Sequence, residues 1–530
     1  MLKRLLIFLI IVTFSSSSIA VAEQVKTVDD YFKNPPVNSS VVVFGPYEAT
    51  VNQFFGMTGS GKLLSGRSFS LLPACKTKNE TVCIESLESR KLGEKNWELG
   101  VLAKNQFPES GLLNHRQYAG EDKYWQYEPF RVSPDGIPFG GIAPIWEMQK
   151  NKFSEGGKYV TSFTIDVDAS SGNLDERQIS VLTTINGIAS VSNFLDAWNG
   201  NGPTLYKLPD DVEFRLKVRL GKVLPNLSPW LKGRMNDVIV KQESSTLIIS
   251  GTPAKVTLLA SDYLTCDQLP KVDEIGNPSP CGDYSFMIRK YDSFNNAFQK
   301  DARYSVGALP YWEPRLKVVG ELNAWTLRTP FSLSRPIDWN RFNGGKCNRN
   351  SEITVISSNA TLDSDFPPIW NESSESLEYE VVSSHLDKSN NQNKGFYSLS
   401  MPKSAATCLW GTDILAAKLE VSITNNEKQS SNVVTSSLTS TSSNFNFNVS
   451  GFNYSRHTIS IKPKTGVGVE IKDVTPLAEV IPPPQELVEG NDATKVGVSK
   501  ITTIKCTKNK IAKRITGVKP KCPAGYKLSK

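Results

Sequence analysis

The chain has 530 residues, of which 39% are hydrophobic and 21% are charged. That length exceeds a single domain of about 100–200 residues, and that composition excludes a chain too polar to bury hydrophobic cores. The formal net charge of +7 conceals an asymmetry, because residues 495–530 hold eleven Lys and Arg and no Asp or Glu, whereas acidic residues outnumber basic ones in residues 23–494. A mildly acidic body with a small, strongly basic tail argues against a nucleic-acid-binding protein.

Residues 1–22 are predicted to be a secretory signal peptide. Lys3-Arg4 form a short basic start, residues 5–14 are an almost unbroken apolar run, and Ala20-Val21-Ala22 end the segment with small residues. This order predicts export with cleavage before Glu23. The alternative is a membrane-spanning anchor, but the apolar run is shorter than the roughly 20 residues that a helical span requires. We expect no integral membrane span after cleavage.

Residues 23–150 form an N-terminal β-rich region in which Val41 to Phe44 are strand-like. Gly56 to Lys62 have the G-x-x-x-x-G-K spacing of a phosphate-binding loop, but Leu63 stands where that loop needs Ser or Thr to hold Mg²⁺. We therefore interpret this stretch as a glycine-rich loop between strands, and we predict no bound cofactor.

An aromatic-rich stretch lies later in the same region. Its members are Tyr118, Tyr124, Trp125 and Tyr127. Core packing is the plainer interpretation, because large aromatic side chains dominate hydrophobic cores. If they are exposed, the same residues form a candidate ligand platform that stacks on sugars or grips a partner.

Residues 151–312 are predicted to form a β domain. Apolar and charged residues alternate strictly from Val212 to Leu220, which predicts a strand with one buried face. Residues 238–240 and 246–249 flank a polar turn and predict a hairpin, and residues 254–260 are expected to add another strand.

Asp166, Asp168 and Ser170 have the alternate spacing of a calcium-binding loop. Gly172 comes one position late, and Arg177 stands where such a loop carries Glu. A turn with solvated carboxylates is the plainer interpretation, and we predict no metal ligand.

Residues 313–465 are predicted to form a β-sandwich domain of the immunoglobulin-like type. Apolar residues alternate with polar ones over residues 419–423 and again over residues 445–449, and short turns separate these stretches. Long amphipathic helices are not evident. The sequence therefore predicts a mainly β, multidomain protein built of antiparallel β-sandwich-like domains.

Residues 466–497 are expected to be a linker that Pro482-Pro483-Pro484 stiffen, and residues 498–530 a small basic module. A hairpin is expected from Ile504 to Ile515. With a disulfide, this hairpin would make a compact C-terminal module.

The eight cysteines fall into neighbouring couples, which we expect to pair in sequence order because each bridge then stays inside one predicted module. The expected disulfides are Cys75–Cys83, Cys266–Cys281, Cys347–Cys408 and Cys506–Cys522. The sequence alone does not choose among the possible connectivities. Metal ligation is the alternative, but no Cys-x-x-Cys occurs and the chain has three histidines.

The end of the chain also carries a recognisable pattern of residues. Its parts are Thr503 to Cys506, Ile515 to Val518, Pro520 to Pro523 and Gly525 to Lys527. The pattern resembles the basic two-cysteine tail of secreted actinobacterial proteins, most of them uncharacterised. Cys408 to Gly411, Gly451-Phe452 and Ser455 to Ile461 are similar to the domain that often precedes such tails. The resemblance implies an envelope or extracellular location, and it brings no activity, ligand or site residue.

No catalytic residue is predicted. His115, His385 and His457 lie far apart, and neither H-E-x-x-H nor G-x-S-x-G occurs. Each histidine is interpreted as a surface or turn residue. A catalytic triad assembled by folding stays open, because triads combine distant positions.

These observations favour a non-enzymatic secreted or cell-envelope protein that binds or adheres through β domains and a basic tail. The alternatives are a secreted hydrolase acting on glycans or peptides and a purely structural surface protein. Anionic cell-wall polymers or lipid headgroups are the expected partners. The candidate contact residues are Lys505, Lys508, Lys510, Lys513, Arg514, Lys519, Lys521 and Lys527.

Overall fold

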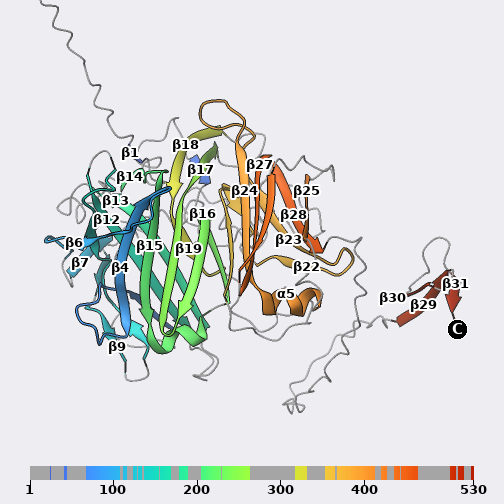
Figure 1. Cartoon of the computed structure of the whole chain (residues 1–530), viewed down its shortest axis with the longest axis horizontal. Coiled ribbons are helices and arrows are strands. Elements are labelled where there is room, and N and C mark those ends of the chain that lie inside the picture. The colour runs from blue at the N-terminus through green and yellow to red at the C-terminus, as the bar shows by residue number, and fades with distance from the viewer. Residues whose placement is uncertain are drawn as a thin grey trace, which may run out of the picture. The chain divides into compact units, whose positions relative to one another are not determined.

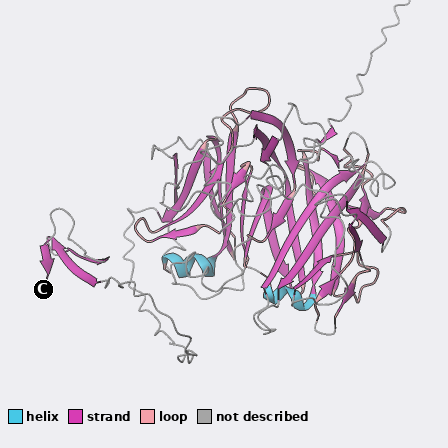
Figure 2. Ribbon diagram, turned by 180° about the vertical axis from the view of Figure 1, so that it is seen from behind, coloured by secondary structure: helices cyan, strands magenta, loops and turns pink. Residues whose placement is uncertain are grey.

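The structure is a computed structural model, and strands dominate the part of the chain that it describes. That part comprises residues 24–25, 41–44, 67–107, 111–115, 123–127, 129–133, 136–153, 156–168, 178–188, 205–227, 229–262, 317–330, 353–364, 367–411, 419–425, 435–441, 443–463, 502–508, 511–517 and 527–529. Among these residues the helical turns are α5 (Lys403–Trp410) and the 3-10 helix η6 (Gly221–Asn226) (Figure 2). The predicted mainly β class is confirmed.

The chain divides into two compact units, Met1–Val474 and Thr475–Lys530. The first unit holds two β-sandwiches, many of whose strands are labelled in Figure 1. Among the described helices, none has both the length and the apolar character that a bilayer span requires.

The first sandwich has one wholly antiparallel sheet in the order β5–β4–β15–β17–β16. Its strands are β4 (Val82–Lys91), β5 (Glu98–Leu99), β15 (Val212–Leu220), β16 (Trp230–Glu243) and β17 (Thr246–Asp262). Along β15 every second residue is buried, so the predicted strand and its buried face are confirmed. Glu243 pairs with Thr246, which confirms the predicted hairpin.

The other sheet of this sandwich is centred on two long strands, β12 (Lys158–Asp168) and β13 (Gln178–Ile188), which pair along almost their whole length. Shorter strands extend it: β1 (Gln24–Val25), β3 (Arg67–Leu71), β6 (Val101–Leu102), β11 (Ile145–Glu147), β14 (Leu205–Tyr206) and β19 (Thr326–Arg328). One hydrophobic core contains residues of both sheets, among them Phe214 and Leu216 of β15 and Tyr159 and Phe163 of β12.

Strand β17 is longer than predicted, because residues 254–260 continue it instead of forming another strand. Its first half pairs with β15 and β16, and its second half pairs with β18 (Lys317–Ala324) and β2 (Val41–Phe44). The neighbours of β17 change around Thr252 and Pro253.

The boundaries expected near residues 150 and 312 do not divide this fold. Strand β4 pairs with β15, and β3 pairs with β12, so residues on both sides of 150 share sheets and one core. Likewise β18 and β19 pair with strands of the first sandwich although they follow residue 312. Pairing between strands so far apart in sequence leaves no local signal, which is why the pattern of turns suggested boundaries there.

The second sandwich comprises residues 353–463 of the described chain. One sheet has the order β20–β24–β27–β26, and the other has the order β21–β23–β28–β25 with β22 beside β23. The strands are β20 (Thr354–Ser358), β21 (Leu362–Asp363), β22 (Ile369–Asn371), β23 (Ser376–Val382), β24 (Lys394–Pro402), β25 (Leu419–Asn425), β26 (Thr435–Ser440), β27 (Asn444–Asn453) and β28 (Arg456–Pro463). Phe445, Phe447 and Val449 face its core, as their alternation predicted.

One continuous hydrogen-bonded sheet joins the two sandwiches. The first half of β16 pairs with β19 on one side and, in parallel, with β20 on the other, where Trp230 is opposite Thr354. Figure 1 shows β16 running between the two groups of strands. Trp230 belongs to the core of the second sandwich, and the neighbouring Leu231 belongs to the core of the first.

Two further hairpins belong to the first unit, and a small sheet forms the second. The hairpins are β7 (Gly111–His115) with β8 (Lys123–Tyr127) and β9 (Arg131–Val132) with β10 (Pro138–Phe139). The small sheet has the order β30–β29–β31, with β29 (Thr502–Lys508), β30 (Ile511–Gly517) and β31 (Lys527–Ser529). The expected hairpin between Ile504 and Ile515 is confirmed, and β31 adds a third strand beside β29.

Several predictions fall outside the described residues. They concern the signal peptide 1–22, the glycine-rich stretch 56–62, the linker 466–497, Tyr118, Lys510, Lys519, Lys521, Cys266, Cys281, Cys347 and Cys522.

Candidate functional site

A cluster of buried charges lies where the two sandwiches meet. Lys232 and Arg234 of β16 and Asp363 of β21 are each no more than 5% exposed. Lys232 Nζ lies 2.8 Å from one carboxylate oxygen of Asp363, and Arg234 Nη1 donates to the other. Arg234 also donates to Ser358 Oγ over 2.8 Å. The cluster ties a strand of one sandwich to a strand of the other.

The carboxyl group of Asp363 is ionised within this cluster. Burial alone would raise the pKa of Asp363, but the charges of Arg234 and Lys232 and the hydrogen bonds from both outweigh burial and hold that pKa well below its usual range. Two cations around one carboxylate compensate the cost of removing that carboxylate from water. Breaking the cluster would strand a buried charge.

Sequence reasoning missed this cluster. Lys232 and Arg234 alternate with Leu231, Gly233 and Met235, a pattern that ordinarily marks a strand with one solvated face. The second sandwich covers that face. The only signal of a buried charge cluster in the sequence was weak. It was the occurrence of Lys232 and Arg234 two residues apart in a strand that starts at Trp230.

A second set of polar residues also connects the sandwiches. Thr361 donates through Oγ1 to the backbone oxygen of Thr257 on β17, over 2.6 Å. The amide of Asn393 donates to Thr257 Oγ1 and to Ser383 Oγ, both over 3.1 Å. All four of these residues are buried, so this junction is held by directional contacts as well as by apolar packing.

The nearest approach to a serine–histidine pair is Ser455 with His457. His457 is only 4% exposed, so its interpretation as a surface residue is corrected: its ring packs edge-on against Phe452. Its Nε2 lies 3.0 Å from Ser455 Oγ and 2.7 Å from the backbone oxygen of Asn453. A carbonyl oxygen only accepts, so Nε2 carries the hydrogen, and the nitrogen free to accept from the serine is Nδ1, which lies 3.5 Å from Ser455 Oγ. That distance is longer than the roughly 2.6–3.2 Å between a nucleophile and its base. This pair lacks the arrangement of an activated nucleophile.

Of the other two histidines, His385 is at the surface as expected, and only the backbone position of His115 is described. His385 is exposed, beside the turn that Asp387 organises by accepting from the backbone of Ser389 and Asn391. His115 is the last residue of β7.

The outward face of the first sandwich carries a ladder of ion pairs between β4 and β15. Glu88 contacts Arg215 and Lys217, and the distance to Lys217 Nζ is 2.8 Å. Arg90 and Glu213 form the next rung, with an N–O distance of 2.6 Å. Burial raises the pKa of Glu88, but hydrogen bonds from Lys217 and Arg215 and their charges outweigh it, so the pKa is lowered.

An aromatic ring is inserted into this ladder. The guanidinium carbons of Arg90 and Arg215 lie 4.3 and 4.0 Å from the centre of the Trp97 ring. Each of these distances is within the range of an attractive cation–π contact. The ladder therefore combines ion pairs with cation–π stacking.

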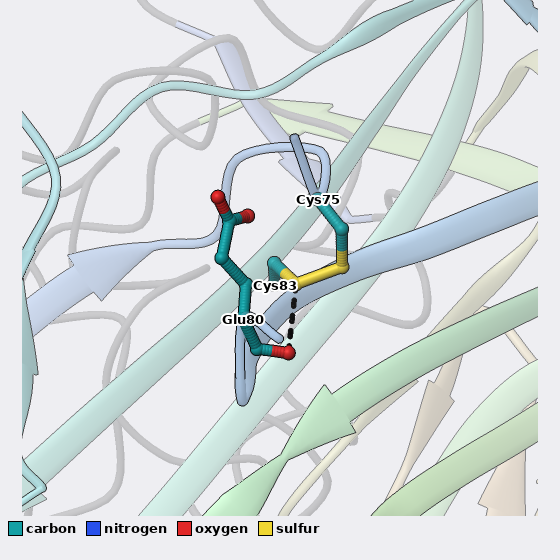
Figure 3. A group of neighbouring side chains, drawn as sticks. All are labelled: Cys75, Glu80 and Cys83. Atoms are coloured by element: carbon teal, nitrogen blue, oxygen red, sulfur yellow. Dashed lines mark hydrogen bonds between the residues drawn. A yellow bond between two sulfur atoms is a disulfide. The ribbon is translucent and has the colours of Figure 1, made fainter. Parts of the chain in front are cut away.

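The predicted Cys75–Cys83 disulfide is confirmed, with the two Cα atoms 5.1 Å apart. Figure 3 shows the bridge with Glu80, whose backbone oxygen lies 3.9 Å from Cys83 Sγ. Donor atoms of these three residues lie within 4.8 Å of one another, as metal ligands would. The sulfurs are oxidised here, and a metal requires thiolates, so we assign this group to structure.

The loop closed by this disulfide has further supports. Glu80 Oε2 accepts from the backbone N–H of Lys76 over 2.8 Å. Arg219 of β15 lies opposite Cys83 in the backbone pairing of β15 with β4. Its Nη1 donates to the backbone oxygens of Lys78 and Glu80 over 2.8 and 3.2 Å. Elsewhere, Cys408 of α5 is also disulfide-bonded.

The aromatic stretch does not form a single platform. Register pairs Tyr124 with Asn114, Trp125 with Leu113 and Tyr127 with Gly111 in the β7–β8 hairpin. Successive residues of a strand belong to opposite faces, so Trp125 and Tyr127 share one face and Tyr124 is on the other. A platform on this hairpin can therefore use two of the described aromatics at a time.

Two residues of the calcium-like spacing, Asp166 and Asp168, lie within the described chain. Asp166 and Asp168 are strand residues of β12, opposite Ser180 and Gln178 of β13. The same residues pair with β3 on the other edge. Both are extended strand residues, with Asp168 the last residue of β12, whereas Ser170, Gly172 and Arg177 lie outside the described residues.

The basic residues of the tail occupy defined positions in the small sheet. Lys505 is directly opposite Arg514 of β30 and Ser529 of β31. Lys513 is opposite Cys506, Lys508 is opposite Ile511, and Lys527 is opposite Thr507. Arg514 and Lys513 are adjacent, so they belong to opposite faces, and the candidate contact residues do not all share one surface.

Comparison with known proteins adds no assignment: no family model matches this chain, and no curated protein matches it.

Proposed function

We propose that this chain is an exported, non-enzymatic protein of the cell envelope whose body is a rigid pair of β-sandwiches and whose tail binds an anionic envelope polymer. The observation that carries this proposal is the segregation of charge: eleven Lys and Arg with no acid in residues 495–530, against a body with an excess of acid. A local excess of positive charge raises the potential around the tail and attracts polyanions.

The signal-like first 22 residues and the disulfides support the exported location. Disulfides persist in oxidising compartments outside the cytoplasm, and Cys75–Cys83 is formed.

The rival function, a secreted hydrolase, has less support. Among the described residues, the buried carboxylate Asp363 is held by two cations. The Ser455 hydroxyl lies 3.0 Å from a histidine nitrogen that already carries a hydrogen, and its distance of 3.5 Å from the other ring nitrogen is long for a nucleophile and its base.

Retention on isolated cell envelopes tests the proposal. The mature protein and a version that ends at Gly490 are incubated with envelopes at about 0.1 M salt and again at about 1 M, between which the screening length falls from about 10 Å to about 3 Å. We expect the mature protein to be retained at low salt and released at high salt, and the truncated version to be released at both. Equal retention of the two proteins at low salt contradicts the proposal.

A further inference from the structure

The register of the small C-terminal sheet divides the basic residues of the tail into two groups. Residues directly opposite each other in an antiparallel ladder share a face, and so do residues two apart along a strand. One face carries Thr503, Lys505, Thr507, Ala512, Arg514, Thr516, Lys527 and Ser529, and is called the basic face here. The other carries Thr502, Ile504, Cys506, Lys508, Ile511, Lys513, Ile515, Gly517 and Leu528, and is called the aliphatic face.

The two faces differ in kind. The basic face has three cations and four hydroxyl residues, and its largest aliphatic residue is Ala512. The aliphatic face has three isoleucines and a leucine, together with two lysines, a cysteine, a threonine and a glycine. Such a composition is typical of a sheet with one face for packing and one for solvent or a ligand.

The basic face also contains a pair of like charges directly across the ladder. Lys505 of β29 is directly opposite Arg514 of β30. Like charges in this position destabilise a sheet. An anion bound between Lys505 and Arg514 would remove this repulsion, so the pair is favourable when the ligand is bound.

The third cation extends this pair across the sheet. Lys527 of β31 is opposite Thr507, so it is a diagonal neighbour of Lys505, at about 7–8 Å. The basic face therefore has one cation on each of its three strands. This spacing suits a ligand with several anionic groups in a row.

We propose that the basic face, through Lys505, Arg514 and Lys527, binds a phosphodiester polymer of the cell envelope; this inference rests on the proposed function and names the surface and the chemistry. Arginine and lysine donate charge-assisted hydrogen bonds to phosphate oxygens. The hydroxyl groups of Thr503, Thr507, Thr516 and Ser529 can donate to phosphates or accept from the hydroxyls of a polyol backbone. A lipid surface is the weaker match, because binding to a bilayer interface grows with buried apolar area and this face offers little.

A charge-matched pair of variants in the full mature protein tests the inference. Lys505→Gln with Arg514→Gln removes two charges from the basic face, and Lys508→Gln with Lys513→Gln removes two from the aliphatic face, on the same two strands. The probes are poly(glycerol phosphate), vesicles of phosphatidylglycerol and vesicles of phosphatidylcholine. At low salt we expect the first variant to bind the polymer at least about tenfold more weakly than the parent and the second to stay within about threefold.

Two further measurements separate binding from folding. The exchange variant with Lys505→Arg and Arg514→Lys keeps both charges and is expected to bind as the parent does. The dependence of log Kd on log salt concentration is expected to become shallower by about 2 in the Lys505→Gln, Arg514→Gln variant and to change less in the other. Loss of binding by the exchange variant as well would mean that the substitutions damage the sheet, and it would overturn the assignment.

The remaining outcomes distinguish the two proposals. If both charge-removal variants lose affinity equally, net charge alone is responsible: the basic face is then excluded, while the envelope-binding tail stands. Binding to phosphatidylglycerol vesicles that is stronger than polymer binding and depends on Lys508 and Lys513 would assign the contact to the aliphatic face and a lipid surface. Unchanged polymer binding by the protein that ends at Gly490 would remove the proposed function itself.

Discussion

Two groups of ion pairs in the first unit use the same residue types for different purposes. At the junction, Lys232, Arg234 and Asp363 are buried, and they join two sandwiches. On the outward face, the Glu88 side chain is itself only 8% exposed, but its partners Arg215 and Lys217 are 27% and 29% exposed, so this group is partly open to water.

The difference between them follows from access to water. Water and salt screen the outer ladder, so each of its contacts adds a modest stabilisation. The junction is shielded, so its charges must satisfy one another, and the arrangement that satisfies them also defines how the sandwiches dock. The junction specifies geometry, and the ladder adds stiffness.

Replacing Asp363 with Asn is the strongest test of this difference. The change leaves two buried cations without their carboxylate, and we expect a loss of about 3–5 kcal/mol in the free energy of unfolding, measured by urea denaturation. Asp211→Asn is the control, because Asp211 pairs with Lys91 at the surface over 3.5 Å with both side chains 56% exposed. It should cost less than about 1 kcal/mol. Similar losses in the two variants would contradict a special role for the junction.

Removing the Cys75–Cys83 disulfide tests the rigidity of the outer sheet. Closing so short a loop contributes about 2–3 kcal/mol in the chain-entropy model. Because Arg219 and Glu80 also hold the loop, we expect the double serine variant to lose about 2 kcal/mol and to keep its fold by far-ultraviolet circular dichroism. Adding Arg219→Gln should cost more in the double serine variant than in the parent. Strict additivity of the two losses would show that Arg219 does not hold the loop.

A smaller loss is expected for Glu88→Gln on the outer ladder. The substitution removes the partner of Arg215 and Lys217, which stay partly hydrated, so we expect a loss of about 1 kcal/mol. The difference from the parent should shrink between about 0.1 M and 1 M sodium chloride because salt screens exposed charges. A loss as large as that of Asp363→Asn would erase the contrast between the two groups.

The smallest expected effect is a difference in how the ladder and the junction respond to acid, measured as the pH dependence of the unfolding free energy. The folded-state pKa values of Glu88 and Asp363 are both lowered, so each carboxylate stabilises the fold above its unfolded pKa of about 4, and that contribution is lost as pH falls through the folded value. Asp363 has the larger depression, so its contribution persists to lower pH. We expect the unfolding free energy of Glu88→Gln to fall less steeply between pH 5 and pH 3 than that of the parent. An identical slope would mean that Glu88 does not titrate in the ladder.

Local patterns predicted the strands, while contacts between distant residues escaped prediction. The alternation from Val212 to Leu220 predicted β15 and its buried face, and Phe445, Phe447 and Val449 predicted β27. Nothing in residues 82–91 signals that they pair with β15, because the partner is more than a hundred residues away. The domain boundaries failed for the same reason.

The candidate sites divide in the same way. The basic tail and its hairpin were evident from charge and turn residues, but the division of Lys513 and Arg514 between faces depends on the register. The buried Lys232 could not be predicted, since lysine is almost always exposed and only the docking of a second sandwich covers it.

The position of β28 has a mechanical consequence. It is the last described strand before the residues that lead to the tail, and it lies between β23 and β25, paired with one or the other from Arg456 to Pro463. If the tail is the point of attachment, as proposed above, tension enters the fold at Pro463. A pull along the axis of a central strand strains the hydrogen bonds on both of its edges together, whereas an edge strand peels away one bond at a time. Attachment through the tail would therefore load a strand that resists extraction.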